Sequence, residues 1–357
     1  MVVDLKRYVR RHAGSDARVT QVAVLGRGQD QVEKGFGYGD PVRVDYVVGG
    51  RTESLVLHTQ RPDAFGHDRR SDRVASTLLA YERSREIPRH VRPIDVGVLG
   101  PDGTFEPLPA GEPCLVTTFA PGRLYAETLR AIAARDAAAP SDLACVDVLA
   151  RYLAMLHSKR LDARDAYVRS IRDTIGGGEG VFGVVDGYTA DDGVAPPSRL
   201  QAIEHAAVEW RWKLRSAAQE RACRIHGDFH PFNILFDDEV GLSLLDCSRG
   251  CVGDAADDVT CLSVNFIFFA LLARDTWSGA LRDLWDHFWA TYLTARKDDG
   301  LASVVAPFFA WRLLVLASKI WYPATRDDVR DRLLLLAERW LSGVPFDPLR
   351  VDVLWAT

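Results

Sequence analysis

The sequence predicts an α+β protein with a small antiparallel β-rich part followed by a larger, mainly helical part. Three short runs before residue 60 alternate between apolar and polar side chains, which is typical of strands. From about residue 255 onward, apolar residues recur at helical spacing. Between these parts lies a loop rich in His, Asp and Asn, which are residue types that carry chemistry.

The β-rich part reads as a three-stranded antiparallel sheet with flanking helices. We expect strands at 19–25, 42–48 and 53–58. An amphipathic pattern over residues 4–12 predicts a helix before them, and a second helix is expected over about 72–85.

The loop at 26–39, between the first two strands, contains five glycines. Glycine lets the backbone come close to a ligand, and successive exposed N–H groups favour phosphate. We therefore expect Lys34, Gly35 and Gly37 to contact the phosphates of a nucleotide. The alternative is a hairpin that is simply flexible.

The chemistry-bearing loop spans 226–233 and reads His-Gly-Asp-Phe-His-Pro-Phe-Asn. Short apolar runs on either side of a Gly-containing turn predict a hairpin over 234–245. Such a hairpin brings Asn233 and Asp246 together at its open end. Phosphoryl transfer from Mg-ATP needs one carboxylate to orient the attacking hydroxyl, and an amide and a second carboxylate to hold the metal. Asp228 fits the first role.

Two histidines in the same loop stand four residues apart. No Glu follows His226, and Pro231 interrupts any helix, and both observations argue against a zinc-protease type of site. We expect His226 to orient the loop. His230 either supports the loop or approaches phosphate.

These residues, with two further segments, resemble the aminoglycoside phosphotransferase and choline-kinase-like family of small-molecule kinases. The first further segment is 148–157, which looks like the family's Leu-Ala-x-Leu-His helix. The second is 252–259, which resembles its Gly-Asp-Pro-x-x-Asp segment, with Ala255 in place of the Pro. The resemblance covers roughly residues 110–265.

The resemblance implies a bilobal protein kinase-like fold, with an N-lobe over 1–119 and a C-lobe over 120–357. It implies ATP and Mg²⁺ as cofactors and a small-molecule hydroxyl as acceptor. It further implies catalytic roles for the Asp and both His side chains of the loop, and metal ligation by Asn233 and Asp246.

In the family, the lobe connector reads the adenine edge with its backbone. The apolar run 114–122, which ends in Pro-Gly, has the position of that connector. The resemblance therefore implies that Thr117 and Phe119 contact the nucleotide.

The sequence departs from the family at the third strand, where a kinase places a Lys that pairs with a helix Glu. His58 stands at the Lys position, and the helix offers Asp72, Ser76 or Thr77 for the Glu. Three interpretations remain: Lys34 or a nearby Arg supplies the charge, His58 does so directly, or nucleotide binding is degraded.

Composition excludes several classes of partner. The net charge of −5 and a pI near 6.0 are no basis for nucleic-acid binding. The longest apolar run, 264–273, is too short for a membrane helix, and residues 1–20 lack the apolar centre of a signal peptide. We expect a cytoplasmic protein without a membrane partner, and the oligomeric state stays open.

Three other features concern packing and the substrate cleft. The six cysteines form no Cys-x-x-Cys pair and are expected to be small buried thiols. The Gly-, Asp- and Pro-rich segment 176–198 is expected to be a mobile insertion near the substrate cleft. The aromatic residues after 277 suit helix packing better than an aromatic cage for a cationic substrate.

The function we expect is ATP-dependent transfer of the γ-phosphoryl group to a hydroxyl of a small molecule. An aminoglycoside, another amino sugar, a choline-like alcohol and a natural-product intermediate all fit, and ATP is not distinguished from GTP. The alternative is a nucleotide-binding pseudokinase, or an interaction protein with a kinase-like fold, that has no turnover.

Overall fold

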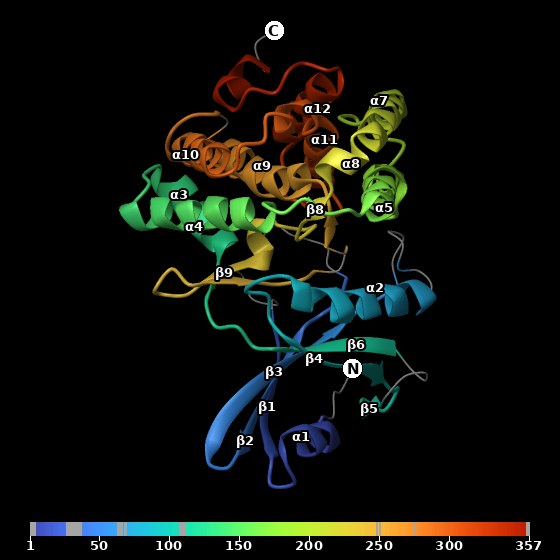
Figure 1. Cartoon of the computed structure of the whole chain (residues 1–357), viewed down its shortest axis with the longest axis vertical. Coiled ribbons are helices and arrows are strands. Elements are labelled where there is room, and N and C mark those ends of the chain that lie inside the picture. Colours follow the sequence, from blue (N-terminus) through green and yellow to red (C-terminus); the bar gives the residue numbers. More distant parts are fainter. Residues whose placement is uncertain are drawn as a thin grey trace.

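A computed structural model of the chain divides into a lobe built on one sheet and a larger helical lobe (Figure 1). The structure describes residues 5–25, 38–62, 67, 70–106, 112–247, 249, 251–274 and 276–354. The predicted α+β, two-lobed architecture is confirmed.

The smaller lobe is a six-stranded antiparallel sheet in the order β1-β2-β3-β6-β4-β5. Its elements are α1 (Lys6–Ala13), β1 (Arg18–Val24), β2 (Val42–Val48), β3 (Arg51–Thr59), α2 (Arg70–Arg83), a 3-10 turn (Ser84–Glu86), β4 (Pro93–Leu99), β5 (Phe105–Glu106) and β6 (Glu112–Thr118). The three predicted strands and both predicted helices are confirmed, with ends that move by a few residues.

Burial alternates along β2, and this shows which face of the sheet packs against the core of the lobe. Val42, Val44 and Tyr46 are buried, whereas the residues between them are only partly buried. The buried side chains join a small core with Tyr8 and Val9 of α1. The helix thus covers the inner face of the sheet, as its amphipathic pattern predicts.

The larger lobe is mainly helical. Its helices are α3 (Tyr125–Arg135), α4 (Pro140–Leu156), α5 (Arg164–Gly176), α6 (Val181–Asp186), α7 (Pro197–Ser216), α8 (Ala218–Arg221), α9 (Ala255–Arg274), α10 (Ala280–Ala295), α11 (Ala306–Ala317) and α12 (Asp327–Leu341), with 3-10 turns at Pro231–Asn233, Leu301–Ser303 and Pro348–Leu354. Its short strands are β7 (Arg123–Leu124), β8 (Cys223–Arg224), β9 (Ile234–Phe236), β10 (Leu242–Leu244) and β11 (Val252–Gly253).

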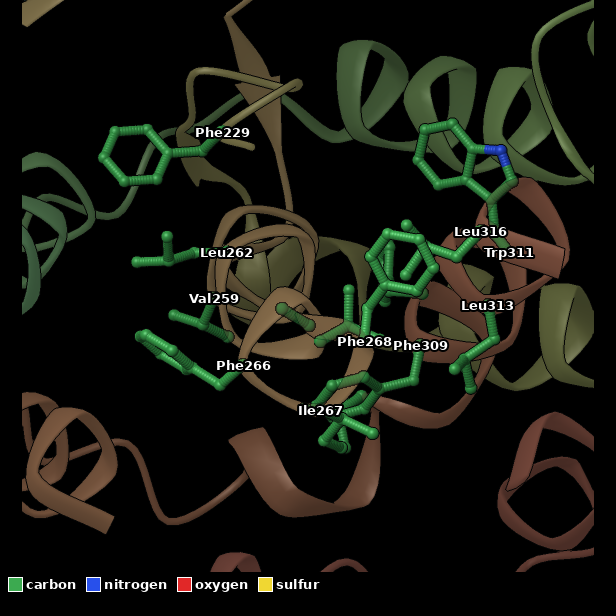
Figure 2. Packing of buried hydrophobic residues seen from close by; sticks show 14 of the residues in the cluster. Phe229, Val259, Leu262, Phe266, Ile267, Phe268, Phe309, Trp311, Leu313 and Leu316 are labelled. Carbon is green, nitrogen blue, oxygen red and sulfur yellow. The ribbon is translucent and has the colours of Figure 1, made fainter. Parts of the chain in front are cut away.

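Helix α9 is the centre of the larger core. Seventeen of its 20 residues are buried, which explains why it lacks the one-sided pattern of a surface helix. By length and composition, among the described residues, it is the one helix that could cross a membrane, but 94% of its apolar window is buried inside the protein. Figure 2 shows Phe266 and Ile267 of α9 in one cluster with Phe309 and Leu313 of α11.

The C-terminal tryptophans serve packing, as the sequence favours. Trp285 and Trp289 are buried, and their rings lie 5.7 Å apart. Trp289 also lies 4.9 Å from Phe346 and Trp340 lies 4.1 Å from Phe309, so these rings fill the space between α10, α11 and α12.

The Gly-rich segment 176–198 differs from the expected irregular insertion. It contains α6, whose Val181 and Val184 are buried in the main core. The segment is also tied to the lobe, because Trp311 donates its indole N–H to the carbonyl of Glu179 at 2.8 Å. The glycines permit this close packing: a Cβ at Gly183 would lie 2.0 Å from the carbonyl oxygen of Gly178.

The two lobes join through residues 119–122, between β6 and β7. β7 pairs with β9, so the connector ends against the hairpin of β9 and β10 that lies between the lobes in Figure 1. Gly122 has φ +141°, and a Cβ there would lie 2.8 Å from the carbonyl oxygen of Phe236. Only glycine fits this position without strain.

The Gly122→Ala variant is therefore expected to lose about 2 kcal/mol or more of unfolding free energy. Equilibrium denaturation in urea measures this loss. Gly193→Ala is the matched control, because a Cβ at Gly193 meets nothing within 4 Å and its backbone is not in the left-handed region. Equal stability of the two variants would contradict the steric argument.

Candidate active site

A buried carboxylate of α9 holds the chemistry-bearing loop. Asp258 accepts hydrogen bonds from the backbone N–H groups of His226, at 2.7 Å, and Gly227, at 2.8 Å. Its Oδ2 also lies 3.0 Å from Nε2 of His157, at the end of α4. Nδ1 of His157 lies 2.9 Å from the hydroxyl of Tyr292 on α10. The three motif segments found in the sequence thus meet at one carboxylate.

The charge of this cluster follows from its burial, since Asp258 and His157 are almost inaccessible to solvent. Burial alone would raise the pKa of Asp258, but the hydrogen bonds from His157 and from the backbone N–H of His226 hold it below its ordinary value. Burial lowers the pKa of His157. The pair is therefore an ionised carboxylate accepting from a neutral imidazole.

Beyond this anchor the loop turns sharply at Gly227, which has φ +83°. Phe229 then enters the main core, where its ring stacks on Tyr152 with centroids 6.0 Å apart. Figure 2 shows Phe229 beside Leu262 of α9. Asp258 and Phe229 fix the loop on both sides of Asp228, which limits where that carboxylate can lie.

Asp228 is nine-tenths buried and is surrounded by donors. Nη1 of Arg312 donates to its Oδ1 at 2.7 Å, and Nε2 of His230 lies 3.5 Å from its Oδ2. Burial alone would raise the pKa of Asp228, but the charge of Arg249, the hydrogen bond of His230 and the charge of Arg312 hold it well below its ordinary value. The carboxylate is ionised at neutral pH.

The two histidines of the loop make local contacts. Nδ1 of His226 accepts from the backbone N–H of Asp228 at 3.3 Å, and Nδ1 of His230 accepts from that of Phe232 at 3.1 Å. These are the contacts expected of residues that support the loop.

The hairpin brings Asn233 and Asp246 to one end, as the sequence predicts. Leu244 pairs with Ile234, and the N–H of Leu245 donates to the carbonyl of Asn233 at 2.9 Å. The amide nitrogen of Asn233 donates inward to the carbonyl of Asp228 at 3.0 Å. Its Oδ1, with the carboxylate of Asp246, supplies oxygen donors of the kind that Mg²⁺ prefers, so the residues fit this metal.

Asp246 has φ +54°, which is uncommon for a residue other than glycine. Such a conformation costs energy and persists where the surrounding structure imposes it, often at functional sites. The charge of Asp246 also acts on the pKa of His58 and of His90, so this carboxylate lies near the β3 strand of the smaller lobe.

His58, expected at the position of the kinase Lys, lies in β3 with Nε2 3.2 Å from the hydroxyl of Thr117, and burial lowers its pKa although Asp246 opposes this. The imidazole is therefore neutral at pH 7. Directly after β3, the side-chain amide of Gln60 donates to Ser76 of α2 at 2.9 Å, so a neutral hydrogen bond joins the strand to the helix.

Other predicted nucleotide contacts divide into two groups. Lys34, Gly35 and Gly37 lie outside the described residues. Thr117 is buried at the end of β6, and Phe119 follows in the connector with the guanidinium of Arg43 4.2 Å from its ring centroid.

The structure adds charged residues that the sequence analysis did not select. Arg312 of α11 contacts Asp228 and also Asp257, at 2.8 Å. Nε of Arg249 lies 3.4 Å from Glu179, whose other oxygen lies 2.9 Å from His67 of the smaller lobe. A signal existed for Arg312 alone, because it interrupts an apolar run from 306 to 317.

The cysteines agree with the expectation of small buried thiols. All six are free, and five of them are buried. Within the part of the chain that the structure describes, no group of three or more His, Cys, Asp or Glu side chains could hold a metal ion.

The Phosphotransferase enzyme family matches this chain over residues 46–297. No curated protein matches significantly. Among solved structures, amicoumacin kinase hAmiN in complex with AMP-PNP, Ca²⁺ and Ami is similar with a TM-score of 0.50 and 14% identity, over 91% of this chain and 92% of that one. LicA in complex with AMP has a TM-score of 0.50 and 12% identity, over 95% and 97%. LicA is elsewhere described as a choline kinase from Streptococcus pneumoniae. At these identities the likeness shows the fold, which is the predicted kinase-like one.

Replacing Asp258 tests the anchor of the loop. An amide has a single oxygen acceptor, so Asp258→Asn leaves a buried N–H of the loop or the imidazole of His157 unsatisfied. We expect a loss of about 3 kcal/mol of unfolding free energy, measured by denaturation followed by circular dichroism.

Asp327→Asn is the control, since Asp327 is exposed although it also pairs with an arginine and a lysine. It is expected to change the free energy by less than about 1 kcal/mol. An Asp258→Asn protein as stable as this control would show that Asp258 does not hold the loop.

Proposed function

Because the chain belongs to the Phosphotransferase enzyme family, we propose that it transfers the γ-phosphoryl group of ATP to a hydroxyl of a small molecule, with Mg²⁺ as cofactor. The observation that carries this proposal is the arrangement of three side chains. Asp228, Asn233 and Asp246 lie around the open end of one hairpin, on a loop that Asp258 anchors. Lobes divided at residue 119 would hold the nucleotide between them.

We assign each of these residues a distinct role. Oδ1 of Asn233 and the carboxylate of Asp246 would hold Mg²⁺, which bridges and neutralises the phosphates when it is bound. Asp228 would accept a hydrogen bond from the acceptor hydroxyl, align its oxygen with the γ-phosphorus and take its proton late. Because its pKa is low, Asp228 is a weak base, and it contributes chiefly by orienting the hydroxyl.

The adenine would lie against the connector between the lobes. We assign its contacts to the backbone around Thr117 and Phe119. His58 is neutral and cannot supply the charge that a Lys supplies in other kinases, so we assign the phosphate contacts to Lys34 with Gly35 and Gly37.

The acceptor is a small molecule with a hydroxyl group. An aminoglycoside, an amino sugar, a choline-like alcohol and a natural-product intermediate are the classes to be screened. The two similar structures described above are named for an amicoumacin kinase and, through LicA, a choline kinase.

A second candidate is a pseudokinase that binds nucleotide without turnover. The neutral His58 and the neutral contact between Gln60 and Ser76 favour it, since both stand where a kinase has charged groups. It predicts that Mg-ATP stabilises the protein although phosphate is transferred to no acceptor.

Asp246→Ala tests the metal site. ATP is expected to raise the melting temperature of the wild type only when Mg²⁺ is also present. The Asp246→Ala variant is expected to lose this rise. Asp238→Ala, in the exposed turn between the same two strands, should keep it. A Mg²⁺-dependent rise of the same size in Asp246→Ala would show that Asp246 does not bind the metal.

Asp228→Asn tests turnover. We expect a fall of about 10³-fold in phosphate transfer, because an amide orients the acceptor hydroxyl less well than a carboxylate and does not take its proton, while Mg-ATP still raises the melting temperature. A coupled assay of ADP release over the acceptor panel measures this. Near-normal rates of transfer in the purified variant would contradict the assignment of Asp228 to the transfer step.

A further inference from the structure

A single arginine in an apolar helix contacts the proposed catalytic carboxylate. α11 reads Ala-Pro-Phe-Phe-Ala-Trp-Arg-Leu-Leu-Val-Leu-Ala, and Arg312 is its sole charged residue. The side chain is 7% exposed. A guanidinium is rarely buried to this extent unless its charge is paired and its N–H groups find acceptors.

Arg312 is paired on two sides. Nη1 donates to Oδ1 of Asp228 at 2.7 Å, whereas Nη2 donates to Oδ1 of Asp257 at 2.8 Å and to the carbonyl of Gly227 at 3.0 Å. The guanidinium carbon lies 3.7 Å from the ring centroid of Trp311. This indole ring is itself fixed by its hydrogen bond to Glu179. The guanidinium group of Arg312 is therefore held in one orientation by its ion pairs, its hydrogen bonds and its stacking on Trp311.

The contact makes the two oxygens of Asp228 unequal. Oδ1 accepts the short, charged hydrogen bond from Arg312. Oδ2 has two longer contacts, at 3.4 Å to the amide of Asn233 and 3.5 Å to His230. An incoming hydroxyl displaces these two long contacts on Oδ2 more easily than the short, charged hydrogen bond on Oδ1.

We infer that Arg312 is a positioning residue, which holds Oδ1 of Asp228 so that Oδ2 faces the acceptor hydroxyl. This inference rests on the proposed function. In the transfer step the hydroxyl oxygen bonds to the γ-phosphorus as the bond from phosphorus to the leaving oxygen of ADP breaks. The hydroxyl proton passes to Oδ2. Arg312 touches none of these reacting atoms and acts through Asp228.

Burial and charge agree with this role. Arg312 is among the cations that keep the pKa of Asp228 low against the effect of burial. Burial raises the pKa of Asp257 to about 6 despite the charge of Arg312, so Asp257 is mostly ionised at neutral pH and can share the guanidinium. Arg312 thereby links α11 to the loop, because its guanidinium pairs with both Asp228 and Asp257.

The test compares Arg312→Gln and Arg312→Lys with a matched control. Arg330 of α12 is equally buried and pairs with Asp192 and Asp327, but it has no contact with Asp228 among the described residues, so Arg330→Lys reports the effect of disturbing a buried arginine. The probe is Mg-ATP with water as the acceptor, followed by phosphate release, and then with any acceptor that the wild type phosphorylates.

The expected result is a change in kcat and not in KM. Arg312→Gln should lower kcat at least about 10-fold while KM for Mg-ATP stays within about 3-fold, since transition-state alignment and not nucleotide binding is lost. Arg312→Lys, which keeps the charge without the forked guanidinium, should retain more of the wild-type kcat than Arg312→Gln.

A purely structural role predicts a different pattern. In that case Arg312→Gln would lose activity only in proportion to its folded fraction, Arg312→Lys would retain no more kcat than Arg312→Gln, and Arg330→Lys would lose as much kcat as Arg312→Gln. Any of these results would overturn the inference.

A double-mutant cycle separates this inference from the proposed function. Melting temperatures of Arg312→Gln, Asp228→Asn and the combined variant need no turnover. A combined loss clearly smaller than the sum of the single losses supports the coupling, and additive losses overturn it. A wild type that binds Mg-ATP but releases no phosphate with any acceptor would overturn the proposed function, while the cycle still decides whether Arg312 holds Asp228.

Discussion

The structure around the site depends on one buried carboxylate, that of Asp258. It accepts the first two N–H groups of the loop and a hydrogen bond from His157, all without access to solvent. An ionised group with this burial is tolerated because each of its partners is a donor. The result is that α4, α9 and the loop cannot move independently, and Asp228 is placed two residues beyond the anchor.

A second layer of buried charge lies on the other side of the loop. Arg312 joins Asp228 to Asp257, the neighbour of Asp258 on α9. Two adjacent residues of one helix thus act on the loop in different ways: Asp258 holds its backbone, whereas Asp257 shares the arginine that contacts the side chain of Asp228. Removing either charge leaves the other groups buried without compensation, so a substitution here is expected to destabilise the protein.

In the smaller lobe, the polar groups at the end of β3 are neutral. His58 is neutral, and Gln60 contacts Ser76 through a neutral hydrogen bond. Contact between the lobes nevertheless exists where His67 meets Glu179 and where the ring of Tyr38 lies 5.5 Å from that of Trp321. Because His58 is neutral, the proposed nucleotide site assigns the phosphate contacts to Lys34 and not to β3.

Much of the fold was determined by the sequence itself, because strands and helices leave local patterns. Alternation predicted β1, β2 and β3, helical spacing predicted α10 to α12, and the short hairpin after Asn233 placed that residue near Asp246. Asp228, Asn233 and Asp246 are close together along the chain, and their spacing is therefore visible in the sequence. For this reason the sequence alone identified them as a group.

Only the tertiary structure decided which distant groups meet. Arg312 lies 84 residues from Asp228 along the chain, and Glu179 comes from a Gly-rich segment whose sequence suggested mobility rather than a packed helix. The sequence contained the segments with His157 and Asp258, but not the contact between them, 101 residues apart. Long-range pairing of charges depends on how helices pack, and no local periodicity records it.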